Sequence, residues 1–362
     1  MYRKWINLTI LFIFLLVVGG GVLIARVDDN EVYYVRRSDV IGFGGVVREE
    51  VVRGMVDALI CEVYGKDSRL EAYREMISSL GGDEVVGLKV SSQGGRMGGT
   101  RVEVVEAVVK GLRDAGLKRE QIVVWDRRRE DLVRCGFRED DMNYVLAWTE
   151  GRGGAGYDEE KFVMVHLLGK LAWGDRGFVE SGEQALERVL LVKEQMSSRR
   201  HWSKILSRRV QKVVHIPSLQ DHFGVGVNGA IVDMTISNMD NWRRFTGPPD
   251  FGDPYLAEVY GEEMVKGKVV LTILDGLYLQ YAGGPFASPA ESKEYGTIFA
   301  SKDAVALDAV ARGLLERERV HVGLPKLRKF TRWIESGEKM GLGLAEEGKV
   351  RLKEIEPIGV GE

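Results

Sequence analysis

Residues 84–126 read EVVGLKVSSQGGRMGGTRVEVVEAVVKGLRDAGLKREQIVVWD, and the prediction of the fold starts from this stretch. The first seven residues are a short apolar run typical of a buried strand, and the four glycines that follow predict a loop. Valine and leucine then recur at helical spacing over residues 104–112. A second β-rich run, residues 121–125, ends at Asp126. Because a helix joins the two strands, we expect them to be parallel, with a right-handed crossover.

The start of this helix has a recognisable signal. Thr100 stands three residues before Glu103, the spacing of a capping box, so Thr100 is the expected N-cap. The unit therefore places a glycine-rich loop, free N–H groups and Asp126 at the edge of a parallel sheet where α/β proteins bind ligands. The loop matches neither the dinucleotide-binding pattern nor the P-loop. Two interpretations stay open: anion binding, or a tight turn of the chain.

Composition narrows the class of protein. The chain has 362 residues, of which 44% are hydrophobic and 29% are charged, as in ordinary globular proteins. A formal net charge of −3 argues against a nucleic-acid partner. Cys61 and Cys135 form no metal motif, and buried free thiols are favoured over a single disulfide. No metal site is predicted, and the cofactor is unknown from the sequence.

The N-terminus predicts a membrane segment. Residues 5–25 form an apolar run of about the length that crosses a bilayer. Basic residues precede it and acidic residues follow it, which favours a cytoplasmic N-terminus and an extracytoplasmic body. A cleaved signal peptide is the competing interpretation, although residues 24–26 are a poor cleavage site. We expect a membrane anchor at 1–26, a connector at 27–46 and a single α/β domain at 47–362.

The rest of the chain alternates helical and strand patterns. Helices are predicted over 47–63, 68–80, 129–135 and 185–196 and after Asp303, and strands over 213–219, 268–274 and 297–300. This alternation predicts an α/β fold with a mostly parallel sheet and helices on both faces, preceded by one N-terminal transmembrane helix. A basic run over 199–212 is expected to be a solvated helix face, with contact to anionic lipid headgroups as the alternative.

Polar residues follow several of the predicted strands. If the strands are parallel neighbours, these residues converge on one rim. His222 follows strand 213–219 beside Asp221, and an imidazole titrates near neutral pH, whereas His215 inside the strand is interpreted as a core histidine. The acid–base candidates are His222, Asp126 and Asp275. The ligand-binding candidates are Gly94, Gly95, Arg96, Gly98, Gly99, Thr100 and Arg101.

Five motifs occur in an order that resembles a known family. They are VVGLKV at 85–90, AGLKREQIVVWD at 115–126, VHIPSLQDH at 214–222, LTILDG at 271–276 and SKDAVALD at 301–308. On these motifs the chain resembles the uncharacterised prokaryotic family catalogued as domain of unknown function 362. The resemblance implies an α/β domain that is often exported and is sometimes associated with iron–sulfur modules. It implies no known reaction.

The chain also departs from the family pattern. An asparagine after the first strand is replaced by Ser91, a Ser-Thr-His-Pro stretch by residues 99–102, a lysine by Gln220, and a Lys-Asn pair by Asp233 and Met234. Two cations that could hold an anion are therefore missing. Arg96 and Arg101 are the expected replacements, and a decayed site is the alternative. Without a cysteine cluster, an iron–sulfur cluster held by this chain alone is not expected.

These observations lead to two functional hypotheses, and they do not decide whether the protein is an enzyme. The first is a membrane-anchored extracytoplasmic α/β protein that binds, and could convert, a small anionic ligand at the C-terminal edge of its sheet. The alternative is a non-catalytic scaffold or partner-binding domain with a degenerate site. The first hypothesis is favoured if one pocket is lined by Arg96, Asp126, His222 and Asp275. The second is favoured if these side chains are paired with other groups and lie far from one another.

Overall fold

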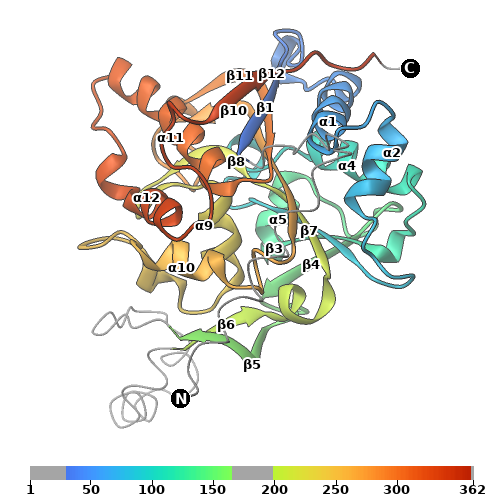
Figure 1. Ribbon diagram of the computed structural model, residues 1–362, viewed down its shortest axis with the longest axis horizontal. Helices are drawn as coiled ribbons and strands as arrows, with labels where there is room; N and C mark the ends of the chain where they lie inside the picture. The colour runs from blue at the N-terminus through green and yellow to red at the C-terminus, as the bar shows by residue number, and fades with distance from the viewer. Residues whose placement is uncertain (1–29, 165–198, 360–362) are drawn as a thin grey trace, which may run out of the picture.

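The structure is a computed structural model that describes residues 30–164 and 199–359 (Figure 1). The predicted membrane segment 5–25 and the predicted helix 185–196 lie outside these ranges. Within the described ranges, no helix combines the length and the apolar character needed to span a bilayer.

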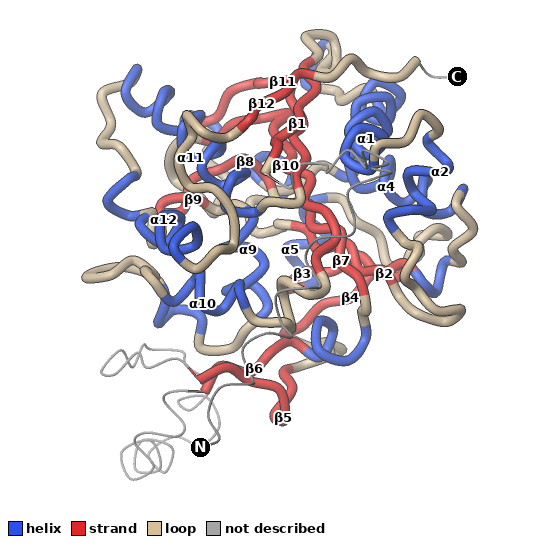
Figure 2. The backbone as a smooth tube through the Cα atoms, viewed as in Figure 1, coloured by secondary structure: helices blue, strands red, loops and turns tan. Residues whose placement is uncertain are grey.

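A mostly parallel sheet forms the centre of the molecule (Figure 2). Its order is β12-β1-β11-β10-β7-β2-β3-β4, with β8 paired to β10 and β9 paired to β8. Only β11 and β9 run antiparallel to their partners in this sheet. The strands are β1 (Glu31–Arg36), β2 (Val86–Val90), β3 (Ile122–Arg128), β4 (Val145–Glu150), β7 (Lys212–Ile216), β8 (Ser218–His222), β9 (Gly226–Val227), β10 (Val269–Gln280), β11 (Ser292–Ser301) and β12 (Arg351–Glu354).

Helices gather on the two sides of this sheet (Figure 1). On one side lie α1 (Glu49–Tyr64), α2 (Arg69–Met76) and α4 (Val102–Asp114), and on the other lie α9 (Ala230–Thr235), α10 (Tyr255–Gly261), α11 (Ala304–His321) and α12 (Arg332–Lys339). Each group packs on its own apolar core. The prediction of an α/β fold with a mostly parallel sheet is confirmed. A separate antiparallel pair, β5 (Tyr157–Met164) and β6 (Arg199–Ser203), lies beside β4 in Figure 1.

The β2–α4–β3 unit forms as predicted. The two strands are parallel, with Leu88 opposite Val124. The cap differs from the prediction, because Arg101 is the N-cap of α4 and its side chain caps no N–H group. Thr100 instead turns into the sheet, where its hydroxyl accepts from Ser91 N at 2.9 Å and donates to Ile216 O at 2.6 Å. Thr100 therefore ties the ends of two neighbouring strands together.

Helical periodicity located several elements closely. Helix α1 occupies the first predicted span, and α5 (Arg129–Cys135) ends at Gly136, which adopts φ 109° as a left-handed C-cap. Asp303 is the N-cap of α11, and its carboxylate accepts from Ala306 N. These ends follow from local chemistry, which explains why the sequence predicts them.

Three other expectations differ from the structure. The expected connector 27–46 contributes β1 to the sheet, because Val32, Tyr33 and Val35 are apolar enough to be buried there. The predicted strand 213–219 divides into β7 and β8 at Pro217, which has no N–H group for a ladder. Strand β10 does not stop at Asp275, and it continues to Gln280 through an irregularity after Gly276.

The basic run over 199–212 is not a solvated helix face, so that interpretation was wrong. It forms β6 and the π-helical turn η3 (Ile205–Arg209). Arg200 is buried with its guanidinium 5.6 Å from the centroid of the Phe245 ring. Lys204, Arg208 and Arg209 are exposed at this turn, and composition alone could not distinguish this arrangement from a helix.

Candidate functional site

A buried lysine organises the carboxyl edge of the sheet. Lys89 lies on β2, whose five residues are all buried, and it is itself 0% exposed. Its Nζ lies 2.9 Å from Asp126 Oδ1 on β3 and 3.0 Å from Asp233 Oδ2 on α9, and it donates to Val90 O at 2.7 Å. A buried ammonium group is tolerated only when it is paired in this way. Burial lowers the pKa of Lys89, but the two carboxylates outweigh this effect and hold the pKa above its ordinary value.

Asp233 connects this lysine to a buried histidine. Its Oδ2 also lies 2.8 Å from His215 Nε2, and its Oδ1 accepts from Ser237 Oγ at 3.1 Å. Burial alone would raise the pKa of Asp233, yet Lys89 and His215 hold that pKa below its ordinary value. Burial lowers the pKa of His215, which keeps the imidazole neutral near pH 7. His215 is thus a core histidine, as interpreted from the sequence.

Asp126 is fixed from the other side by Ser92. Its Oδ2 accepts from Ser92 N at 2.8 Å and from Ser92 Oγ at 2.6 Å. Four residues from β2, β3, β7 and α9 (Lys89, Asp126, His215 and Asp233) therefore form one hydrogen-bonded group, which we call the Lys89 network. The Lys89 network thus contains two carboxyl groups and one ammonium group, and its imidazole is kept neutral by burial.

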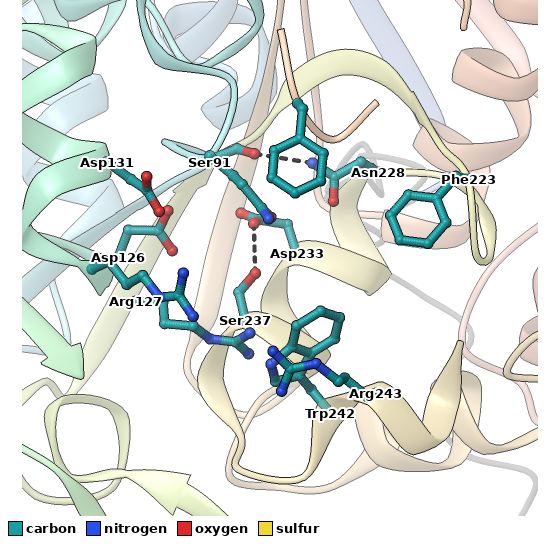
Figure 3. A pocket seen from close by; sticks show the side chains of 13 residues that line it. Ser91, Asp126, Arg127, Asp131, Phe223, Asn228, Asp233, Ser237, Trp242 and Arg243 are labelled. Carbon is teal, nitrogen blue, oxygen red and sulfur yellow. Dashed lines mark hydrogen bonds between the residues drawn. The ribbon is translucent and has the colours of Figure 1, made fainter. Parts of the chain in front are cut away.

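A pocket of about 280 Å³ opens beside the Lys89 network (Figure 3). It lies where β2 and β3 end, at the edge at which α/β sheets bind ligands. Charged and aromatic side chains dominate its wall: Asp126, Asp131, Asp233, Arg127, Arg128, Arg243, Phe223, Trp242 and Phe286. Ser91, Gln93, Asn228 and Ser237 complete the lining. Figure 3 shows Asp126 next to Asp131, and Trp242 next to Arg243 across the pocket.

Two of the pocket arginines are stacked on one indole ring. The guanidinium of Arg127 lies 4.8 Å and that of Arg243 lies 4.7 Å from the centroid of the Trp242 ring. Arg127 also donates to Ile236 O, and its Nε lies 3.7 Å from Glu150 Oε1. Stacking and hydrogen bonding hold these planar cations in place, which suits them to bind the planar oxygens of an acid group.

Of the sequence-predicted acid–base residues, only Asp126 lines this pocket. Asp275 lines a separate cavity of about 10 Å³ together with Gly98, Gly99 and Arg101. Its carboxylate accepts from Arg101 N at 2.7 Å and from Leu277 N at 3.0 Å. Burial raises the pKa of Asp275. Its observed contacts hold the start of α4 against β10.

His222 does not line the pocket either. It is buried at the end of β8, where its Nδ1 accepts from Gly224 N at 3.0 Å and its ring stacks on Phe223 at 5.1 Å. Burial lowers the pKa of His222 to about 4. The next residue, Phe223, reaches the pocket instead. The His222 imidazole thus stabilises the turn that leads to Gly224, below the rim of the pocket.

The glycine loop is built by close packing. A Cβ on Gly94 would lie 2.5 Å from Gly98 C, and one on Gly99 would lie 2.6 Å from Cys135 Sγ. Gly95 has φ 56° and starts the short helix α3 (Gly95–Gly98). These contacts favour the tight-turn interpretation, and of residues 93–100 only Gln93 lines the larger pocket.

The two loop arginines are also away from the larger pocket. Arg96 is exposed, and the guanidinium of Arg101 donates to the carbonyls of Arg96 and Gly99 and lies 4.3 Å from the centroid of the Tyr278 ring. Arg96, Asp126, His222 and Asp275 therefore do not share one pocket. Within the described ranges, no group of three or more His, Cys, Asp or Glu residues could hold a metal ion.

Sequence reasoning missed most of the pocket. Lys89 carried a usable signal, since a lysine inside an apolar strand requires buried counter-charges. Asp233 was noted only as a lost cation, although it supplies one of these counter-charges. Arg127, Trp242 and Arg243 follow no motif, and only the fold brings them to one wall.

Comparison with known proteins gives a family without a described activity. No curated protein matches this chain. A crystal structure of a protein from Thermotoga maritima is similar, at 11% sequence identity and a TM-score of 0.35. The similarity covers 81% of this chain and 59% of the Thermotoga maritima chain. Residues 195–312 match the model of the uncharacterised family described as domain of unknown function 362, which confirms the resemblance over that part of the chain.

Proposed function

We propose that the protein binds a small anionic ligand in the pocket beside the Lys89 network. The observation that carries the proposal is the presence of Arg127, Arg128 and Arg243 in the wall of one 280 Å³ pocket at the carboxyl edge of the sheet. That volume is slightly below the usual range for drug-sized ligands, so the ligand is small. The anion contacts these three pocket arginines rather than the loop arginines Arg96 and Arg101.

The location of the protein is part of this proposal. Residues 5–25 anchor the chain in the membrane, and the body lies on the extracytoplasmic side. The support is the length of the apolar run and the basic residues before it. In that location the pocket is accessible to solutes outside the cytoplasm.

The experiment is a binding measurement on the full chain in detergent. Inorganic phosphate, acetate and succinate are titrated by calorimetry against the parent, Arg243→Gln and Arg138→Gln. Arg138 is an exposed arginine that pairs with Asp140 and does not line the pocket, so it is the matched control. We expect at least one anion to bind and Arg243→Gln to weaken it about tenfold, the loss of roughly 1.4 kcal/mol. Equal affinity in all three proteins would refute the proposal.

A scaffold or partner-binding domain is the second candidate. It is favoured by the contacts of His222 and Asp275, each of which holds a neighbouring backbone segment. This candidate expects none of the three anions to bind at millimolar concentration.

A further inference from the structure

The pocket wall contains as many acidic as basic side chains. Asp126, Asp131 and Asp233 line the same cavity as Arg127, Arg128 and Arg243. A pocket selected for a simple anion gains nothing from carboxylates in its wall, because each repels the ligand through a medium of low dielectric constant. The acidic side therefore needs its own explanation.

The Lys89 network does not neutralise this acidic side. One ammonium group, with its Nζ 2.9 Å and 3.0 Å from the two carboxylates, compensates one of them. Burial keeps His215 uncharged, so it supplies a hydrogen bond and no net charge. Asp131 is paired with Arg134, whose side chain is 67% exposed and whose charge solvent screens. The three carboxylates, which lie on β3, α5 and α9, therefore outnumber the single buried ammonium group that faces two of them.

The rim of the pocket adds an apolar component. Phe223 is 66% exposed and Phe286 is 55% exposed, and both line the pocket with Trp242. Large exposed aromatic side chains beside a cavity are typical of surfaces that a ligand covers.

We propose that the ligand is a zwitterion with an apolar body, in the chemical class of an amino acid. Its protonated amine lies against Asp126 and Asp233, and its acid group lies against Arg127 and Arg243. The apolar body contacts Phe223 and Phe286. This inference rests on the proposed anion-binding function. It adds to the ligand a positively charged amine and an apolar body.

The test compares three molecules that share one body. Phenylalanine carries both charges, 3-phenylpropanoate carries only the acid and 2-phenylethylammonium carries only the amine. A second set, 4-aminobutyrate, butyrate and butylammonium, tests a wider separation of the charges. Each is titrated by calorimetry into the full chain in detergent. We expect the zwitterion of at least one set to bind about tenfold more tightly than both of its singly charged analogues, a factor worth roughly 1.4 kcal/mol.

Two variants assign the charges to the two walls. Asp131→Asn removes one acidic charge without touching Lys89, and it should reduce the advantage of the zwitterion over the acid. Arg243→Gln should reduce the affinity advantage of the zwitterion over the amine analogue. Arg138→Gln and Asp140→Asn alter an exposed pair outside the pocket and should leave both ratios unchanged. Far-ultraviolet circular dichroism checks that each variant is folded.

The outcomes separate this inference from the proposed function. If 3-phenylpropanoate or phosphate binds through Arg243 and no zwitterion binds more tightly than its acid analogue, the zwitterion is ruled out and anion binding stands. If in both sets the amine analogue binds as tightly as the zwitterion, and neither phosphate nor an acid analogue binds, the acid group is irrelevant and both proposals fail. If none of the molecules binds, both proposals also fail.

Discussion

Lys89 on β2 and Asp233 on α9 form an ion pair of 3.0 Å between residues that are 144 positions apart in the chain. Both side chains are buried, and Asp126 holds the same ammonium group from β3. The pair therefore fixes a helix to the central strands at the point where the pocket opens. Removal of this ion pair should therefore lower the stability of the fold, and any loss of ligand binding should be secondary to that effect.

Lys89→Met should reduce the free energy of unfolding by about 3–5 kcal/mol, because two buried carboxylates lose their common cation. Urea denaturation measures the loss. Lys110→Met is the matched control, since Lys110 is an exposed partner of Asp114 and should change stability by less than about 0.5 kcal/mol. A Lys89→Met protein within about 1 kcal/mol of the parent would contradict a paired lysine at this position.

His222→Ala should destabilise the protein by about 1–3 kcal/mol, because the buried Gly224 N–H loses its acceptor. The affinity for any anion of the pocket should stay within about twofold, since His222 does not line it. His321→Ala, at the exposed end of α11, is the control for both readouts. Loss of ligand affinity at unchanged stability would instead restore His222 as a site residue.

The His222 contribution should also depend on pH. Burial lowers the pKa of His222 to about 4 in the folded state, from 6.5 in the unfolded chain. Between these values the unfolded chain binds more protons, so the stabilisation is complete above pH 6.5 and is lost as the pH falls towards 4. The difference in unfolding free energy between the parent and His222→Ala should therefore narrow from pH 7 to pH 4. A difference that is constant over this range is the contrary result.

Gly99→Ala should cost about 1–3 kcal/mol, because its Cβ would lie 2.6 Å from Cys135 Sγ and 2.8 Å from Ser91 O. Gly82→Ala, where a Cβ meets nothing within 4 Å, should change stability far less. Thermal unfolding of the two variants decides between a packing role and a ligand role for the glycine loop. A stable Gly99→Ala protein that has lost anion binding would favour the ligand role.

The full-length protein should remain in the membrane fraction after extraction at alkaline pH with carbonate, and detergent should release it. The reason is the apolar run 5–25, which is long enough to span a bilayer. N-terminal sequencing of the released protein should begin at or near Met1. Release by carbonate, or a mature N-terminus beyond residue 26, would replace the anchor with a peripheral contact or a cleaved signal peptide.

Elements whose signals are local can be predicted from the sequence. The β2–α4–β3 unit, the end of α5 at Gly136 and the start of α11 near Asp303 depend on periodicity and on one or two neighbouring residues. The same holds for the class of the fold, because alternating strands and helices leave few arrangements of a parallel sheet. Asp126, which lines the larger pocket, was a candidate because the end of a parallel strand is a ligand-facing position.

Which polar residues meet depends on long-range packing that local sequence signals do not contain. The partners of Lys89 are residues 126, 215 and 233, and no spacing rule connects these positions. His222 and Asp275 follow predicted strands as Asp126 does, but the break at Pro217 and the continuation of β10 direct them to backbone N–H groups. The physical reason is that a side chain takes its role from burial and from its partners in space, which long-range packing sets.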